Sequence, residues 1–167
     1  MEDVLFMVAI PSSLIATQYI THCAACQALF LTGGCYNDKY YVERWSFLMK
    51  KVISTSGAPA AIGPYSQAIL AGDTLFASGQ IAPDAGDVVK QAEKAFDGVE
   101  AILREAGFEM SEIVKATVFL ADMADFARVN EVYARRMPAP FPARSAIQVA
   151  ALPKGALVEI EVIAKKC

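Results

Sequence analysis

The C-terminal part of the chain holds an arginine and a glutamate in a setting where most neighbours are apolar or neutral. They are Arg144 and Glu159, in the stretch FPARSAIQVAALPKGALVEIEVIA (141–164). Arginine presents a planar fork of N–H donors that matches a carboxylate and keeps its charge. Glutamate can hold or deprotonate a water molecule. Two interpretations are open at this point: a solvated sheet face with surface ion pairs, each worth about 0–1 kcal/mol, or a functional site.

This stretch is predicted to form a closing β-hairpin, with strands over 144–149 and 157–164 and a turn near 153–154. The two-residue period of a strand places Arg144 and Glu159 on faces directed away from the core. With that turn, the two residues are about four positions apart along the strands, on the order of 13 Å. That separation predicts that a neighbouring subunit completes the pocket.

Three further residues are candidates for the site, and a fourth is set aside. Tyr65 follows a Gly-Pro turn in IGPYSQAI, and Ser78 and Gly79 stand at a strand end in ASGQIA, where backbone amides are accessible. Asn130 lies in a predicted helix, and we interpret it as a structural helix residue.

Several other chemistries are excluded by residue inventory. The only histidine, His22, lies far from the other candidates, so a Ser-His-Asp mechanism is not expected. The LTGGC stretch lacks the Lys-Ser/Thr pair of a phosphate-binding loop. Cys23 and Cys26 form a C-x-x-C without a second pair of ligands, so no metal site is predicted. A net charge of -3 and a pI near 5.2 argue against general nucleic-acid binding.

The charge distribution divides the chain near Met49. No Asp, Glu, Lys or Arg occurs from Val4 to Asn37, whereas residues 49–167 have the charge content of an ordinary domain. Residues 1–48 are therefore an apolar extension with three interpretations: a dispensable or mis-assigned start, a targeting or membrane segment, or an integral part of the fold. The start MKKVISTS at Met49 favours the first.

Within 49–167 the pattern predicts an α+β domain of order ββ-α-β-α-ββ, a mixed sheet with two helices on one face. A hairpin is expected over 66–82 around Gly72-Asp73. An apolar stripe predicts a helix over 88–106, which Asp87 caps and Gly107 ends. A β-branched strand over 113–122 and a helix over 124–136 follow.

Four stretches in this order carry a family resemblance: APAAIGPYSQAI, SGQI, VKATVFLADMADFARVNEVY and PARSAIQVAALPKGALVEIEVIA. With them, residues 49–167 resemble the RidA/YjgF family of reactive-intermediate imine deaminases, also called the L-PSP endoribonuclease family. The resemblance implies a RidA/chorismate-mutase-like fold, assembled as a homotrimeric barrel with ligand clefts between subunits. It also implies hydrolysis of 2-aminoacrylate and 2-aminocrotonate to 2-keto acids and ammonia, without a cofactor or metal.

Carried onto this chain, the resemblance gives each candidate a role. Arg144 binds the substrate carboxylate, Tyr65 closes the pocket, Ser78 and Gly79 form its wall, and Glu159 positions or activates water. The segment 81–88 looks shorter than the family pattern.

Two other functions and a question of location accompany this hypothesis. One alternative is an RNA-cleaving or translation-inhibiting protein; the other is a non-catalytic trimer that binds a small ligand or acts like a chaperone. Nothing in the cysteine spacing indicates a disulfide framework, which favours the cytoplasm. Residues 1–48 would instead direct the protein to an organelle or membrane if they act as a leader or anchor.

Overall fold

A computed structural model describes residues 50–166 of the chain. The predicted extension 1–48, with His22 and the C-x-x-C motif, lies outside the described residues. Six strands and two longer helices make up the fold: β1 (Lys50–Ile53), β2 (Ala68–Ala71), β3 (Thr74–Gln80), α4 (Val88–Glu105), β4 (Ile113–Leu120), α5 (Phe126–Arg136), β5 (Ala143–Gln148) and β6 (Val158–Lys165). Short 3-10 turns connect several of them.

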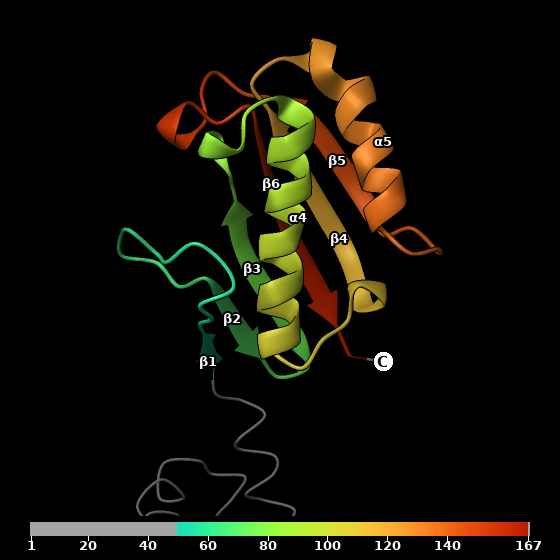
Figure 1. The fold of residues 1–167 in the computed structure, drawn as a ribbon. Coiled ribbons are helices and arrows are strands. Elements are labelled where there is room, and N and C mark those ends of the chain that lie inside the picture. The colour runs from blue at the N-terminus through green and yellow to red at the C-terminus, as the bar shows by residue number, and fades with distance from the viewer. Residues whose placement is uncertain (1–49, 167) are drawn as a thin grey trace, which may run out of the picture. The chain divides into compact units, whose positions relative to one another are not determined.

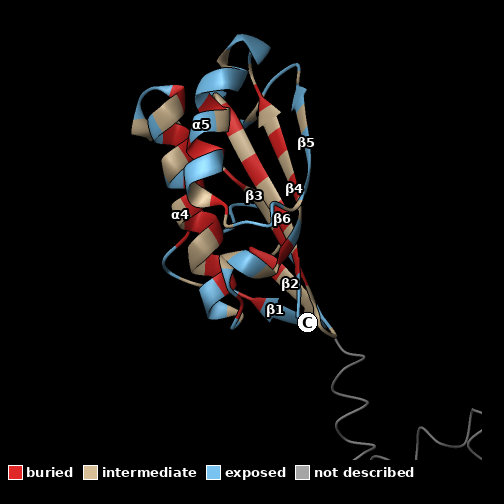
Figure 2. Ribbon diagram, turned by 90° about the vertical axis from the view of Figure 1, so that its right-hand side faces the viewer, coloured by how far each residue is buried: buried red, intermediate tan, exposed pale blue. Residues whose placement is uncertain are grey.

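The strands form one mixed sheet in the order β1-β2-β3-β6-β4-β5. All neighbours are antiparallel except β4 and β5, which run parallel. Both helices cover the same face of the sheet, and the other face is left open (Figures 1 and 2). The predicted α+β class and the two helices on one face are confirmed. The strand β1 was not predicted, because four residues with three of them exposed give no alternating pattern.

The elements from β2 to α5 follow the sequence prediction closely. The β2-β3 hairpin turns at Gly72, whose φ of 63° suits glycine. The Asp87 side chain accepts a hydrogen bond from the Lys90 amide at 3.0 Å and so caps α4. Gly107 ends that helix with a φ of 77°.

The predicted closing hairpin is wrong. Strand β6 inserts between β3 and β4, and β5 pairs with the outer side of β4 instead of with β6. Burial explains the arrangement. The alternate residues Val158, Ile160, Val162 and Ala164 of β6 are at most 2% exposed, as a central strand requires, whereas five of the six residues of β5 are exposed, which suits an edge.

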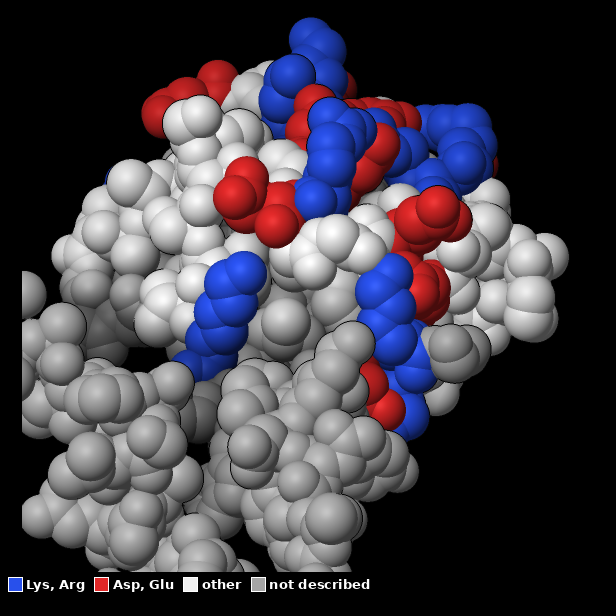
Figure 3. All heavy atoms as spheres, turned by 90° about the horizontal axis from the view of Figure 1, so that it is seen from below, with Lys and Arg blue, Asp and Glu red and all other residues white. Residues whose placement is uncertain are grey.

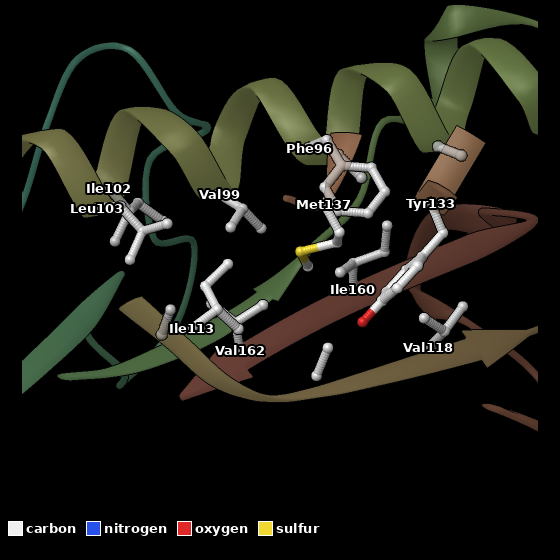
Figure 4. Packing of buried hydrophobic residues seen from close by; sticks show 14 of the residues in the cluster. Phe96, Val99, Ile102, Leu103, Ile113, Val118, Tyr133, Met137, Ile160 and Val162 are labelled. Carbon is white, nitrogen blue, oxygen red and sulfur yellow. The ribbon is translucent and has the colours of Figure 1, made fainter. Parts of the chain in front are cut away.

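The core lies between the two helices and the sheet (Figure 4). Phe96 and Val99 of α4, Tyr133 of α5 and Ile160 of β6 are all buried there. The rings of Phe96 and Tyr133 pack edge to face with centroids 5.9 Å apart, which joins the two helices. No helix between residues 50 and 166 is long and apolar enough to cross a membrane.

Candidate active site

The Glu159 carboxylate lies directly over the backbone of Gly79. A Cβ atom added to Gly79 would stand 2.6 Å from Cδ and 2.8 Å from Cγ of Glu159, so only glycine leaves room for the side chain. Glu159 extends from β6 toward β3 at a point where the β3-β6 register shifts between Ala77 and Gln80. The bulge thus gives this carboxylate its place against the main chain.

Hydrogen bonds from the side chains of Gln80 and Ser78 stabilise the bulge. The Gln80 Nε2 group donates to the carbonyl oxygens of Ser78 and Gly79 at 3.0 and 3.3 Å, from a side chain only 5% exposed. The Ser78 hydroxyl donates to the Ser66 carbonyl oxygen at 2.7 Å, which ties the bulge to the loop that carries Tyr65. Tyr65 is half exposed, one position before Ser66. We call Tyr65, Ser78, Gly79 and Glu159 the Glu159 half-site.

Burial changes the acid-base behaviour of Glu159. Desolvation raises the pKa of its carboxyl above the ordinary value of 4.5, and the negative charge of Glu161 raises it further. Glu161 is two positions along β6 and therefore on the same open face. A carboxylate with a raised pKa is a better proton acceptor than an ordinary one, which fits a group that activates water.

Arg144 lies elsewhere, on the edge strand β5. Its Cα pairs with that of buried Ala116, so the side chain points to the face of the sheet that carries the helices. There the Nη1 group donates to the Asn130 Oδ1 atom at 2.8 Å, and the guanidinium carbon lies 4.4 Å from the centre of the Tyr133 ring. The prediction that Arg144 points away from the core face is wrong, whereas that for Glu159 is confirmed.

Sequence reasoning missed Asn130 as a site residue. It was interpreted as a structural helix residue, yet its amide is the hydrogen-bond partner of the candidate carboxylate-binding arginine. No local pattern contains this information, because Asn130 and Arg144 come together only when α5 packs beside β5.

A hollow of about 310 Å³ opens beside the guanidinium. Its lining residues come from α5 and from the segment that leads into β5: Asn130, Tyr133, Ala134, Phe141, Pro142 and Arg144. The volume accommodates a small organic acid. We call Arg144, Asn130, Tyr133 and the adjoining hollow the Arg144 half-site.

The two half-sites are not brought together within one chain. Arg144 pairs with Ala116 of β4, which in turn pairs with Val162 of β6. Glu159 precedes Val162 by three residues, so the backbones of Arg144 and Glu159 are on the order of 14 Å apart. The two side chains also occupy opposite faces of the sheet. One small substrate therefore cannot touch both groups of the same subunit.

Charge on the described surface is mixed. On the face seen in Figure 3, lysine and arginine side chains lie among aspartates and glutamates. Arg136 illustrates the pattern, since it is paired with Glu93, Asp97 and Glu100 at 2.9–3.4 Å. Within residues 50–166 no cluster of three or more His, Cys, Asp or Glu side chains could hold a metal ion.

Comparison with known proteins agrees with this fold. The family model described as Endoribonuclease L-PSP matches residues 55–166. A 2-iminobutanoate/2-iminopropanoate deaminase of Capra hircus is 51% identical over 126 residues, which covers 71% of this chain and 92% of the relative.

Solved structures point the same way. RidA from an Antarctic Psychrobacter is 44% identical with a TM-score of 0.68, over 70% of this chain and 99% of that one. Escherichia coli TdcF, solved with bound serine, is also 44% identical, with a TM-score of 0.65 over 70% of this chain and 99% of that one. The chain belongs to the RidA/YjgF family, the L-PSP family of the matching model.

Proposed function

We propose that this protein is a 2-iminobutanoate/2-iminopropanoate deaminase, which hydrolyses reactive 2-imino acids to 2-keto acids and ammonia. Curated relatives that carry this name are about half identical to the chain over nearly their whole length. The structural observation that carries the proposal is a helix-anchored arginine at a small hollow, together with a carboxylate of raised pKa.

The proposed reaction needs orientation and one activated water. The enamine tautomerises to the imine, whose carbon is electrophilic once the nitrogen is protonated. Arg144 holds the substrate carboxylate, and Glu159 accepts a proton from water as the water oxygen bonds to the imine carbon. Glu159 then returns this proton to the nitrogen of the tetrahedral carbinolamine. The C–N bond breaks and ammonia leaves, while the hydroxyl group gives its proton back to Glu159 and becomes the carbonyl of the 2-keto acid. Tyr65 closes the pocket, and Ser78 and Gly79 form its wall.

The proposed active unit is a homotrimer with each pocket between two subunits. The separation of the half-sites within one chain supports this arrangement, because an Arg144 half-site of one subunit can face a Glu159 half-site of the next. The open face of the sheet also exposes large apolar side chains, among them Val52 (58%), Phe76 (48%) and Ile147 (44%). A second copy of the chain would cover such a surface.

Activity is tested by generating 2-aminoacrylate with a pyridoxal-phosphate dehydratase and following pyruvate release. The proposal requires faster release with the wild-type protein than in buffer, and no acceleration with Arg144→Ala or Glu159→Gln. Equal rates with and without the wild-type protein would reject the deaminase function and favour a non-catalytic, ligand-binding trimer.

Subunit exchange tests the shared pocket. Mixing Arg144→Ala with Glu159→Gln should restore part of the activity, because some interfaces in mixed trimers combine two intact half-sites. Native mass spectrometry confirms that the exchange took place. If exchange is complete and no activity returns, the functional residues act within one chain.

RNA cleavage is the second candidate, favoured by the description of the family model as an endoribonuclease. The mixed charges on the face seen in Figure 3 oppose it, since RNA binding rests on a continuous basic surface. Incubation with a labelled single-stranded RNA tests this candidate. We expect the wild-type protein to cleave the RNA no faster than the Arg144→Ala variant does. The proposed location is the cytoplasm, which fractionation of cells that express the full chain would check.

A further inference from the structure

One stripe of helix α5 faces the Arg144 side chain. Phe126, Asn130 and Tyr133 follow the spacing i, i+4, i+7, which places them on one side of the helix. The guanidinium carbon of Arg144 lies 4.4 Å from the Tyr133 ring centre and 5.6 Å from that of Phe126. Both distances are within the range in which a cation is attracted to an aromatic ring. Two rings and one amide of α5 therefore surround this arginine.

These contacts use one part of the guanidinium and leave another part available. Nη1 donates to the Asn130 Oδ1 atom at 2.8 Å. Among residues 50–166 the guanidinium makes no other hydrogen bond. Nε and Nη2 form the side-on edge of the group, and two parallel N–H bonds from one edge match a carboxylate.

We propose that Asn130 and Tyr133 are positioning residues, which orient the Arg144 guanidinium so that its Nε–Nη2 edge binds the substrate carboxylate. The Tyr133 ring packs against the guanidinium and holds it in place. Asn130 accepts a hydrogen bond from Nη1, which disfavours end-on binding of a carboxylate through both Nη atoms. This inference rests on the proposed deaminase function, in which Arg144 binds the carboxylate. It assigns roles to α5 residues that the sequence pattern presented as core or structural.

The hydroxyl of Tyr133 has no part in this arrangement. Tyr133 is 5% exposed, and its hydroxyl oxygen is buried with no hydrogen-bond partner in the described chain. Figure 4 shows the ring reaching from α5 toward the sheet, away from solvent. The supporting role therefore belongs to the ring face, and phenylalanine should retain most of it whereas leucine should not.

The test measures binding of the reaction product 2-oxobutanoate to the intact protein by titration calorimetry, beside the turnover of 2-iminobutanoate. Tyr133→Leu should weaken 2-oxobutanoate binding roughly tenfold and raise KM more than it lowers kcat. Tyr133→Phe should recover most of that loss. Asn130→Ala, at a half-buried position, should weaken binding several-fold and gives a second route if the leucine variant does not fold.

Val129→Ala is the matched control. Val129 is buried on α5 and does not line the hollow beside Arg144, so its truncation should lower the melting temperature without changing the Kd for 2-oxobutanoate. In an Arg144→Ala background, Tyr133→Leu should cause no further loss of binding, because Tyr133 acts only through the arginine.

Four outcomes would overturn the inference. The first is wild-type affinity for 2-oxobutanoate in both Tyr133→Leu and Asn130→Ala, and the second is an equal loss of affinity in Tyr133→Leu and Tyr133→Phe. The third is a loss of affinity in Val129→Ala that follows its loss of stability, and the fourth is no binding of 2-oxobutanoate by the wild type. Failure of the deaminase proposal is seen separately, as a wild-type protein that does not turn over 2-iminobutanoate while it binds 2-oxobutanoate through the same three residues.

Discussion

The Glu159 half-site and the Arg144 half-site place opposite charges by different means. Glu159 is positioned by the main chain: a bulge in β3 and a missing side chain at Gly79 make the space that it fills. Arg144 is positioned by other side chains, an amide and two rings of α5, at an exposed edge of the sheet. A carboxylate can thus be partly desolvated in the middle of a sheet, while a guanidinium at the edge keeps its charge and needs only to be oriented.

The contrast predicts the largest effect for Arg144→Lys. Lysine keeps the charge but loses the fork and the partner for Asn130, and hydrogen bonds to a charged group are worth about 1.5–3 kcal/mol each. We expect kcat/KM for 2-iminobutanoate to fall by roughly two orders of magnitude, with the melting temperature nearly unchanged because the position is exposed. Turnover equal to that of the wild type would contradict bidentate binding.

Gly79→Ala should have an effect of at most the same size, and it acts on the other half-site. The new methyl group displaces the Glu159 carboxylate, and a misplacement of about 1 Å can lower the rate by roughly 100-fold. Steady-state kinetics should show a lower kcat, with KM less affected because the carboxylate-binding arginine is untouched.

The control for this substitution is a double variant. In a Glu159→Ala background, the added methyl group has no side chain to displace, so Gly79→Ala should cause no further loss. An undiminished effect there would mean that glycine is needed at this position for a reason other than Glu159.

Glu161→Gln should have a smaller effect, visible mainly in the pH profile. The Glu161 charge raises the pKa of Glu159, so its removal lowers that pKa. If deprotonated Glu159 activates water, the acid limb of kcat/KM moves to lower pH and activity at neutral pH changes little. Glu105→Gln, an exposed carboxylate at the end of α4, is the matched control and should leave the limb in place. A limb that stays in place in both variants would separate Glu159 from proton transfer.

Removal of residues 1–48 should have the smallest effect. Both half-sites lie between Tyr65 and Glu159, and the described domain has its own core. A chain that begins at Met49 should fold, trimerise and keep its activity within about twofold, as sedimentation and pyruvate release would show. Insolubility of the shortened chain beside a soluble full chain would make the extension part of the fold.

Much of this protein can be predicted from local sequence patterns. The helix over 88–106, its cap at Asp87 and its end at Gly107 follow from the apolar period and from capping chemistry, which act over a few residues. The hairpin around Gly72 follows for the same reason. The candidate residues Arg144, Glu159, Ser78 and Gly79 could be named because their types suit the chemistry and because the flanking motifs resemble a family.

From the sequence alone follow both helices, every strand except β1, the class of fold and a set of candidate residues without Asn130. The insertion of β6 between β3 and β4 becomes visible only in the folded structure, where it places Arg144 on the helix-bearing face and away from Glu159. Alternation along a strand shows which residues share a face, but the pairing of strands and the packing of α5 decide which face is covered. The contact between Asn130 and Arg144 has the same origin, because it joins residues whose proximity depends on how a helix packs beside an edge strand.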